Sequence, residues 1–228
     1  MKIIIATIKS WNIENAKILQ KQHLGIHEIK IIDNKEEFVL EKIKSFQPDI
    51  IFIPHWSYII PKEIYENYKC VVFHMTDLPF GRGGSPLQNL IVRGYKETKI
   101  SAIKVTKEID AGPIYLKECL DLSGSAEDIF KRASDVIFSK MIPKFLLEDI
   151  VPCEQDGDIV SFKRRTPAES ELKEEMDMET IYDYIRMLDA EGYPNAYINL
   201  GTKKVAFKNV KWCGNKLHAE VEILEENQ

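Results

Sequence analysis

The chain has 228 residues, of which 44% are hydrophobic and 29% are charged, and its formal net charge is −5. This composition is typical of a globular protein with a substantial core, and it provides no global basic field that would favour nucleic acid. The four cysteines are scattered without a CxxC pair, which argues against zinc and against a disulfide framework. The N-terminal stretch turns polar too early for a signal peptide, and no apolar run approaches the roughly 20 residues that span a bilayer. We therefore expect a cytoplasmic protein with no metal and no membrane partner.

In the first half of the chain, short β-branched runs alternate with helical patterns. Strands are expected over 2–7, 27–33, 49–53 and 69–73, and helices over 12–22 and 35–46. Such alternation predicts an α/β fold, with a Rossmann-like, mainly parallel sheet and flanking helices.

The second half begins with a well-marked helix over 85–94, in which Ser85 is a candidate cap, Pro86 stands in the first turn and Gly94 ends the helix. Residues 151–175 are polar and are expected to form a surface linker. Two strands are expected over 99–106 and 113–119, and a long helix over 125–147. A shorter helix is expected over 178–190, and three further strands over 195–200, 203–210 and 217–224. We predict two domains, a core over 1–165 and a small C-terminal helix and β appendage over 166–228.

One histidine, His74, stands at the carboxyl end of the fourth predicted strand, where parallel α/β sheets bind ligands. The turn EIDAGP at 108–113 carries Asp110, and the two side chains could form a base and the group that orients it. Each residue has a plainer interpretation: His74 as a satisfied core or capping histidine, and Asp110 as a turn residue. The helix that starts at Ser85 could hold an anion together with Arg82. The first strand–helix turn lacks GxGxxG, which disfavours a dinucleotide cofactor.

These motifs together resemble the folate-dependent formyltransferase family, which includes methionyl-tRNA, glycinamide ribonucleotide and amino-sugar N-formyltransferases. The family pattern is Asn-x-His, Ser-Leu-Leu-Pro, an Arg-Gly with a downstream proline, and a later Asp-x-Gly. This chain has VFHMTDLPFGRGGSP at 72–86 and EIDAGPI at 108–114, and WSYIIPKEIY at 56–65 is similar to a further family segment. The resemblance covers roughly residues 1–165. It implies the formyltransferase fold, 10-formyltetrahydrofolate as the formyl donor and a primary amine as the acceptor.

The resemblance also implies roles for individual residues. His74 would relay a proton or stabilise the tetrahedral oxyanion as an imidazolium, and Asp110 would hold His74 or a proton-carrying water. The pterin of the donor would lie in a slot between Tyr58–Ile59–Ile60 and the 105–110 loop, and core packing is the plainer interpretation of Ile59 and Ile60. The expected donor-binding residues are Tyr58, Ile59, Ile60, Leu78, Pro79, Val105 and Ile109.

One position departs from the family pattern, because its asparagine falls at Val72, which cannot polarise a formyl oxygen. Loss of such a donor typically costs about 10²- to 10³-fold in rate. His74 and backbone N–H groups could carry this load, or Thr76, Gln88 or Asn89 could substitute. Val72 is also the best support for an alternative in which the chain binds folate or a nucleotide without catalysis.

The acceptor is predicted from charge and from the appendage. From residue 166 onward, seven Lys/Arg stand against thirteen Asp/Glu, a net of −6, which argues against a tRNA surface. The segment RRTPAESELK and the later IYDYIRMLDAEGYPNAYI resemble the post-core segment of sugar N-formyltransferases. We therefore expect an amino-sugar acceptor, nucleotide-activated or a nonulosonic acid such as a pseudaminic acid precursor, and no nucleic acid. Methionyl-tRNA formyl transfer is the alternative among enzymes.

An anionic sugar needs cationic and stacking side chains. The expected acceptor-binding residues are Lys9 and the Arg82–Gly83–Gly84–Ser85 segment for the anion, Asp77 for the incoming ammonium, and Trp11 or Trp56 for stacking. Half-buried packing is the plainer interpretation of each tryptophan, and a solvated loop carboxylate that of Asp77. A homodimer paired through 193–200 and 203–210 is left open.

Overall fold

The computed structural model describes residues 1–225, which form two compact units. The first unit comprises Met1–Gly83, Thr98–Leu120 and Lys131–Ser161. The second unit comprises Gly84–Glu97, Asp121–Phe130 and the chain from Phe162 onward.

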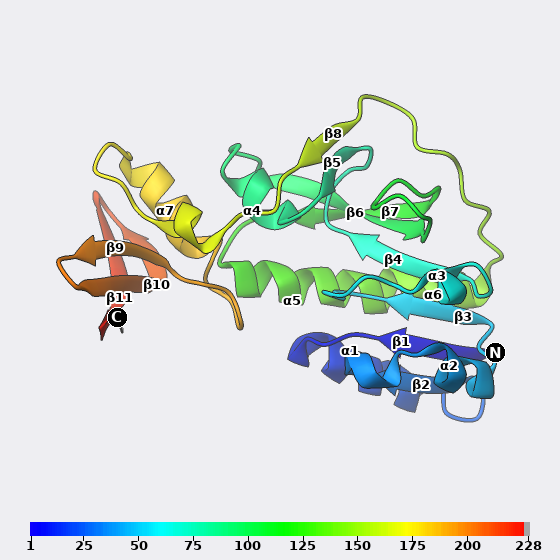
Figure 1. Cartoon of the computed structure of the whole chain (residues 1–228). Coiled ribbons are helices and arrows are strands. Elements are labelled where there is room, and N and C mark those ends of the chain that lie inside the picture. Colours follow the sequence, from blue (N-terminus) through cyan, green and yellow to red (C-terminus); the bar gives the residue numbers. More distant parts are fainter. Residues whose placement is uncertain (226–228) are drawn as a thin grey trace. The chain divides into compact units, whose positions relative to one another are not determined.

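The first unit is built on a six-stranded sheet with the strand order β2–β1–β3–β4–β6–β7 (Figure 1). The strands β1 (Lys2–Ala6), β2 (Glu28–Ile32), β3 (Ile50–Ile53) and β4 (Cys70–His74) pair in parallel. In contrast, β6 (Glu97–Lys104) runs antiparallel to β4, and β7 (Ile114–Asp121) forms the outer edge. The predicted α/β fold with a mainly parallel sheet is confirmed.

Helices cover both faces of this sheet. Alternate residues of each strand point to opposite faces, so each strand contributes side chains to both layers of packing. On one face, Ile4 of β1 and Ile51 of β3 share a buried cluster with Ile43 of α2 (Leu40–Phe46) and Ile64 of α3 (Lys62–Tyr65). On the other face, the ring of Phe52 packs against Phe73 and against Phe145 of α6 (Ile142–Leu147). Burial on two sides explains why these strands read as continuous apolar runs.

Several predicted elements differ in their boundaries. The helix expected over 35–46 divides into a 3₁₀ turn at Lys35–Glu37, capped by the side chain of Asn34, and α2. The helix expected over 125–147 divides into α5 (Ala126–Val136), a π-helical segment at Ile137–Met141 and α6. Pro143 has no N–H to continue the regular helical ladder, which accounts for the wider turn before it. The first helix, α1 (Ser10–Gln22), begins two residues before the expected start at residue 12.

The predicted linker contains structure that its composition did not reveal. β8 (Val160–Phe162) pairs with β5 (Phe80–Gly83) in a two-stranded sheet, and a 3₁₀ turn follows at Pro167–Ser170. Both strands are short and carry glycine or polar residues, so neither shows the apolar alternation that identifies a strand.

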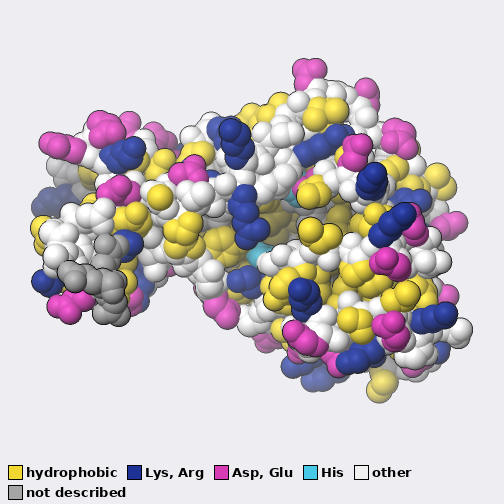
Figure 2. Space-filling model, viewed as in Figure 1, with side chains coloured by type: hydrophobic (Ala, Val, Ile, Leu, Met, Phe, Trp, Pro, Cys, Tyr) yellow, Lys and Arg dark blue, Asp and Glu magenta, His cyan; other side chains and the backbone are white. Residues whose placement is uncertain are grey.

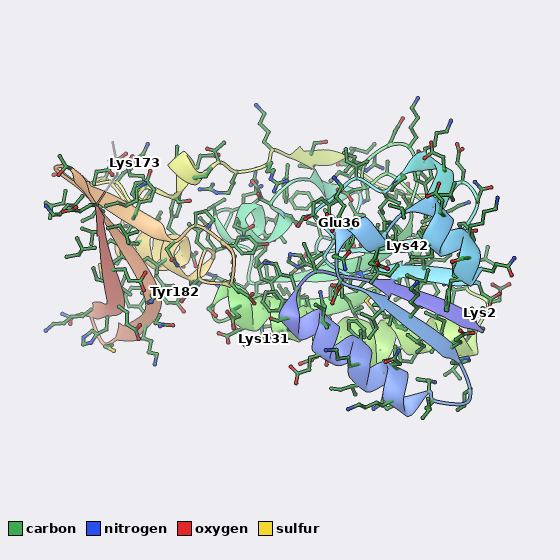
Figure 3. All side chains as sticks on the ribbon, turned by 60° about the horizontal axis from the view of Figure 1, so that its bottom comes forward. Lys2, Glu36, Lys42, Lys131, Lys173 and Tyr182 are labelled. Carbon is green, nitrogen blue, oxygen red and sulfur yellow. The ribbon has the colours of Figure 1, made fainter. Side chains whose placement is uncertain are left out.

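The second unit contains α4 (Pro86–Ile91), α7 (Met178–Arg186) and a three-stranded antiparallel sheet in the order β11–β10–β9. The strands are β9 (Ala196–Leu200), β10 (Lys203–Cys213) and β11 (Lys216–Glu225). Tyr182 projects from α7 (Figure 3). The centroid of its ring lies 5.8 Å from that of Trp212 on β10. The predicted C-terminal helix and β strands are confirmed. No helix among residues 1–225 combines the length and apolarity needed to cross a bilayer.

His55, which directly follows the β3–Pro54 stretch, has a left-handed backbone with φ = 53°. The ring of Trp11 packs edge-on against its imidazole, with 6.1 Å between the ring centroids. Burial lowers the pKa of His55 to about 4, and the charge of Lys9 acts in the same direction. His55 is therefore neutral in the folded protein at neutral pH.

This neutral histidine predicts a pH dependence of stability. An unfolded histidine takes up a proton near pH 6.5, so the contribution of His55 is complete above that pH and is lost as the pH falls towards 4. We expect the free energy of unfolding to fall by roughly 1–3 kcal/mol across this window. Urea unfolding at pH 7.5 and pH 5 measures it. The variant His55→Asn, which tolerates the left-handed backbone, should show a smaller fall. The exposed-site control His218→Gln should keep the wild-type fall, and an undiminished fall in His55→Asn would contradict the assignment.

Candidate functional site

His74 is the last residue of β4 and is 9% exposed. It lies on the same face of the strand as Val72, two residues earlier, because side chains alternate along a strand. The chain then turns through 75–79 into β5, and the carbonyl oxygen of Gly81 returns to within 2.8 Å of His74 Nε2. The end of the strand and the glycine-containing loop together fix the imidazole.

The structure brings Asp110 to the other side of this ring. Asp110 Oδ1 lies 3.5 Å from His74 Nδ1, and Asp110 Oδ2 accepts a 2.9 Å hydrogen bond from the backbone N–H of Gly83. Asp110 has φ = 54°, a left-handed conformation that Asp and Asn tolerate better than most residues. Two segments about 30 residues apart in sequence thus converge on one histidine, in the geometry that the sequence predicted for a base and its orienting group.

Hydrogen-bond roles in this pair follow from the chemistry of its acceptors. A carbonyl oxygen only accepts, so a neutral His74 ring carries its proton on Nε2 and presents the Nδ1 lone pair to the carboxylate. A ring with protons on both nitrogens donates to both acceptors. The arrangement is therefore suited to an imidazolium at His74, with Asp110 as its counter-charge.

Gln155 joins this site, although sequence reasoning placed it in a linker. Its Oε1 accepts hydrogen bonds from Arg82 Nε at 3.0 Å and Arg82 Nη2 at 2.7 Å. Its Nε2 donates to the carbonyl oxygens of Asp110 at 2.8 Å and Gly112 at 2.9 Å. No local pattern around Gln155 signals these long-range bonds. Arg82, predicted to bind the acceptor, has its Nε and Nη2 atoms engaged by this amide.

Asp77, predicted to bind the acceptor ammonium, lies between two lysines. Lys117 contacts one carboxylate oxygen at 2.5 Å, and Lys99 contacts the other at 3.0 Å. Burial raises the pKa of the Asp77 carboxyl, but hydrogen bonds from Lys117 and Lys99 outweigh it, so the net shift is downward. Lys117 also donates to the carbonyl oxygen of Leu78. The contacts of Lys99 and Lys117 therefore stabilise the conformation of the 77–79 turn.

The residues predicted to bind the donor divide into buried and exposed groups. Ile60 and Val105, from the two sides of the predicted slot, both pack against the same core cluster. Leu78 is fully buried. In contrast, Ile59 is 89% exposed and Ile109 is 74% exposed, while Tyr58 is exposed beside the ring of Trp56 and Pro79 forms a cis peptide with Leu78.

The residues predicted to bind the acceptor lie in several local settings. Lys9 lies over the ring of Trp11, which is itself buried. Trp56 packs against Phe38, and its Nε1 is buried without a hydrogen-bond partner among residues 1–225. Gly84 and Ser85 belong to the second unit. A Cβ on Gly84 would lie 2.6 Å from Cβ of Arg164, so close packing explains that glycine.

Ser85 occupies the N-cap position of α4, as the sequence predicted, but it does not cap the helix with its side chain. Its backbone is left-handed with φ = 49°, and its side chain makes no cap hydrogen bond. Its Oγ instead accepts a hydrogen bond from the backbone N–H of Arg165.

Val72 packs against the buried cluster of the first unit, so its side chain cannot contact a reacting group through a hydrogen bond. The three polar residues considered as substitutes are all engaged with backbone carbonyls. Thr76 donates to Gly81, Gln88 to Met187, and Asn89 to Gly84, Ser85 and Lys163. Backbone N–H groups remain as donors for an oxyanion, and His74 can serve as one only by exchanging its Nε2 contact with the Gly81 carbonyl oxygen. Among residues 1–225, no group of three or more His, Cys, Asp or Glu side chains could hold a metal ion.

Comparison with known proteins gives two family matches in tandem. The sequence profile of the formyl transferase family matches residues 13–144. The profile of the methionyl-tRNA formyltransferase C-terminal domain matches residues 167–224.

Individual relatives agree with these profiles. A methionyl-tRNA formyltransferase of Bacillus cytotoxicus is 30% identical over 209 residues, which are 88% of this chain and 64% of that protein. The chain thus spans under two thirds of the length of this curated relative. A solved structure of a methionyl-tRNA formyltransferase from Clostridium thermocellum is 56% identical, has a TM-score of 0.98 and covers 99% of this chain and 100% of that one. HypX from Aquifex aeolicus in complex with tetrahydrofolic acid shares the fold, with a TM-score of 0.76 at 18% identity over 92% of this chain and 38% of that one.

These comparisons correct two predictions. The amino-sugar acceptor is wrong, because the relatives with the higher identities are methionyl-tRNA formyltransferases. The prediction of no nucleic-acid partner is wrong for the same reason. One cause was treating the net charge of the C-terminal segment as if it described every surface of it, whereas phosphate binding needs only a few well-placed cations. The other was the likeness of the appendage segment to sugar N-formyltransferases, which did not identify the acceptor.

The predicted resemblance at the level of the family is confirmed, because the matched profile covers more than half of the chain, including the strand end that carries His74 and the turn that carries Asp110. The chain belongs to the formyl transferase family.

Proposed function

We propose that this chain transfers a formyl group from 10-formyltetrahydrofolate to the amine of methionyl-tRNA. The observation that carries the proposal is the 56% identity to a methionyl-tRNA formyltransferase along nearly the whole chain. The match of residues 167–224 to the C-terminal domain of such enzymes supports the same acceptor.

The residues of the predicted slot fit the donor. A bicyclic ring needs apolar walls and a few polar groups. Ile59 and Ile109 expose apolar surface that a bound ring would cover, and Ile109 directly precedes Asp110. The unpartnered Nε1 of Trp56 is a hydrogen-bond donor in the adjoining segment. When bound, the donor supplies an activated formyl group.

In this reaction His74 and Asp110 act as one unit. The acceptor amine forms a bond to the formyl carbon and releases one proton, and the donor nitrogen takes one proton up as its bond to that carbon breaks. Negative charge develops on the formyl oxygen, and the Nε2–H of His74 would stabilise it by exchanging its contact with the Gly81 carbonyl oxygen for the formyl oxygen. Asp110 would balance the charge on the ring, while the N–H of Gly83 prevents its carboxylate from turning away. Because Val72 packs into the core, the oxyanion depends strongly on His74.

The second unit offers cations for an RNA backbone despite its acidic composition. Lys163 and Arg164 are both exposed and adjacent in sequence. Basic and acidic side chains are interspersed over the visible face of the molecule, with no large area of a single charge (Figure 2). A few such cations suffice for phosphate contacts, because each one releases counterions from the nucleic acid.

The test of this function is formyl transfer to methionyl-tRNA. Purified protein is mixed with 10-formyltetrahydrofolate and initiator methionyl-tRNA, and formylmethionyl-tRNA is quantified by mass spectrometry of the released amino acid. We expect turnover that falls by about 10²- to 10⁴-fold in His74→Ala and Asp110→Asn, the range for loss of an oxyanion donor or a positioned acid–base group. The exposed-site variant Asp158→Asn should retain wild-type activity. Absence of product with wild-type protein would contradict the proposal.

Phosphate contacts by Lys163 and Arg164 predict a change in salt dependence. The double variant Lys163→Gln/Arg164→Gln should reduce the slope of log affinity against log salt by about 2, roughly one for each lost contact. Filter binding of methionyl-tRNA between 50 and 200 mM salt measures the slope. Lys17→Gln/Lys21→Gln, which removes two exposed charges from α1, is the matched control. Equal slopes in both double variants would place the RNA backbone elsewhere.

A further inference from the structure

All of the hydrogen-bonding capacity of the Gln155 side-chain amide is directed at the site. Its oxygen accepts two hydrogen bonds from Arg82, and its nitrogen donates one each to the carbonyl oxygens of Asp110 and Gly112. The side chain is half-buried and belongs to the first unit, as do all its partners. A side chain that makes four hydrogen bonds within one site is fixed in a single orientation.

The 110–112 turn, to which Gln155 donates its hydrogen bonds, has a backbone conformation that needs stabilising contacts from outside the turn. Asp110 has a left-handed backbone, and a Cβ on Gly112 would lie 1.8 Å from the carbonyl oxygen of Lys104. Backbone in such sparsely populated or crowded geometry persists only where its surroundings determine it. Gln155 binds the carbonyl oxygens on both sides of Ala111 and so fixes the turn at two points.

Gln155 also holds the segment that binds the Asp110 carboxylate. Arg82 immediately precedes Gly83, whose N–H donates to Asp110 Oδ2. One amide therefore binds both the backbone that carries the carboxylate and the guanidinium of the residue next to Gly83, whose N–H donates to that carboxylate. The distance of 3.5 Å between Asp110 Oδ1 and His74 Nδ1 depends on the relative placement of these two segments.

We propose that Gln155 is a positioning residue, which holds the Asp110 carboxylate against His74 by fixing the 110–112 turn to Arg82. The proposal rests on the proposed roles of His74 and Asp110. Glutamine is the side chain that suits the position, because it accepts from a guanidinium at one atom and donates to two carbonyls at the other. Glutamate keeps the Arg82 contact but has no hydrogen for the carbonyls, and leucine of similar size keeps neither.

The experiment compares Gln155→Leu and Gln155→Glu with wild type, alone and combined with Asp110→Asn. The first readout is the ring ¹⁵N spectrum of His74 in the full-length protein at pH 7, which requires neither donor nor acceptor. We expect both Gln155 variants to move the Nδ1 resonance of His74 in the direction that Asp110→Asn moves it. In the Asp110→Asn background, neither should move it further, since residues that act through one another are not additive.

The second readout is kinetic. We expect kcat for formyl transfer to fall by about 10- to 100-fold in Gln155→Leu with KM changed by less than about threefold, because misplacement of a catalytic group affects the transition state more than substrate binding. In the Asp110→Asn background the further loss should be under about twofold. Glu154→Gln, at the exposed neighbouring position, is the control and should leave both readouts unchanged.

The two readouts separate failure of this proposal from failure of the proposed function. If wild-type protein formylates no methionyl-tRNA, the His74 spectrum still tests the positioning role. An unmoved Nδ1 resonance in folded Gln155→Glu overturns the proposal, as does a loss of kcat in Gln155→Leu that is equally large with and without the Asp110 carboxylate. If Gln155→Leu fails to fold, Gln155→Glu decides, since it retains the acceptor for Arg82.

Discussion

The placement of one carboxylate, that of Asp110, determines what the His74 end of the sheet can do. The carboxylate is held by the Gly83 N–H on one oxygen and faces the imidazole with the other, while its own backbone is left-handed. The left-handed backbone and the half-buried charge both cost free energy. They persist because the surrounding hydrogen bonds, including those of Gln155, satisfy the groups involved.

The sheet explains why the site lies where it does. Parallel strands β1, β3 and β4 are buried on both faces, so polar side chains can be accommodated only at the strand ends. His74 closes β4 at such an end. Val72, on the same face as His74, is partly buried against the core cluster, and its aliphatic side chain has no group that could donate a hydrogen bond. A strand end therefore carries the chemistry, and the interior of the strand two residues earlier carries only packing.

Sequence reasoning predicted the features that short-range patterns encode. Alternation of strands and helices predicted the parallel sheet, and the positions of His74 and Asp110 at a strand end and a turn predicted their approach. It missed β5, β8 and Gln155, because each depends on a partner far away in the chain. Gln155 lies 45 residues from Asp110 in a polar segment whose composition is that of a linker. Hydrogen bonds of this kind leave no periodicity in the sequence.

The error over the acceptor has a related physical origin. A net charge of −6 after residue 165 is a sum over all faces of a segment, whereas a nucleic acid contacts one face. Lys163 and Arg164 stand outside the summed segment and are exposed, while acidic side chains within it are partly committed to neighbours, as Glu222 is to Lys208 and Asp183 to Arg186. Whether a protein attracts phosphate thus depends on which charges remain exposed on one face after local ion pairs form. The net charge summed over the segment does not give this local charge.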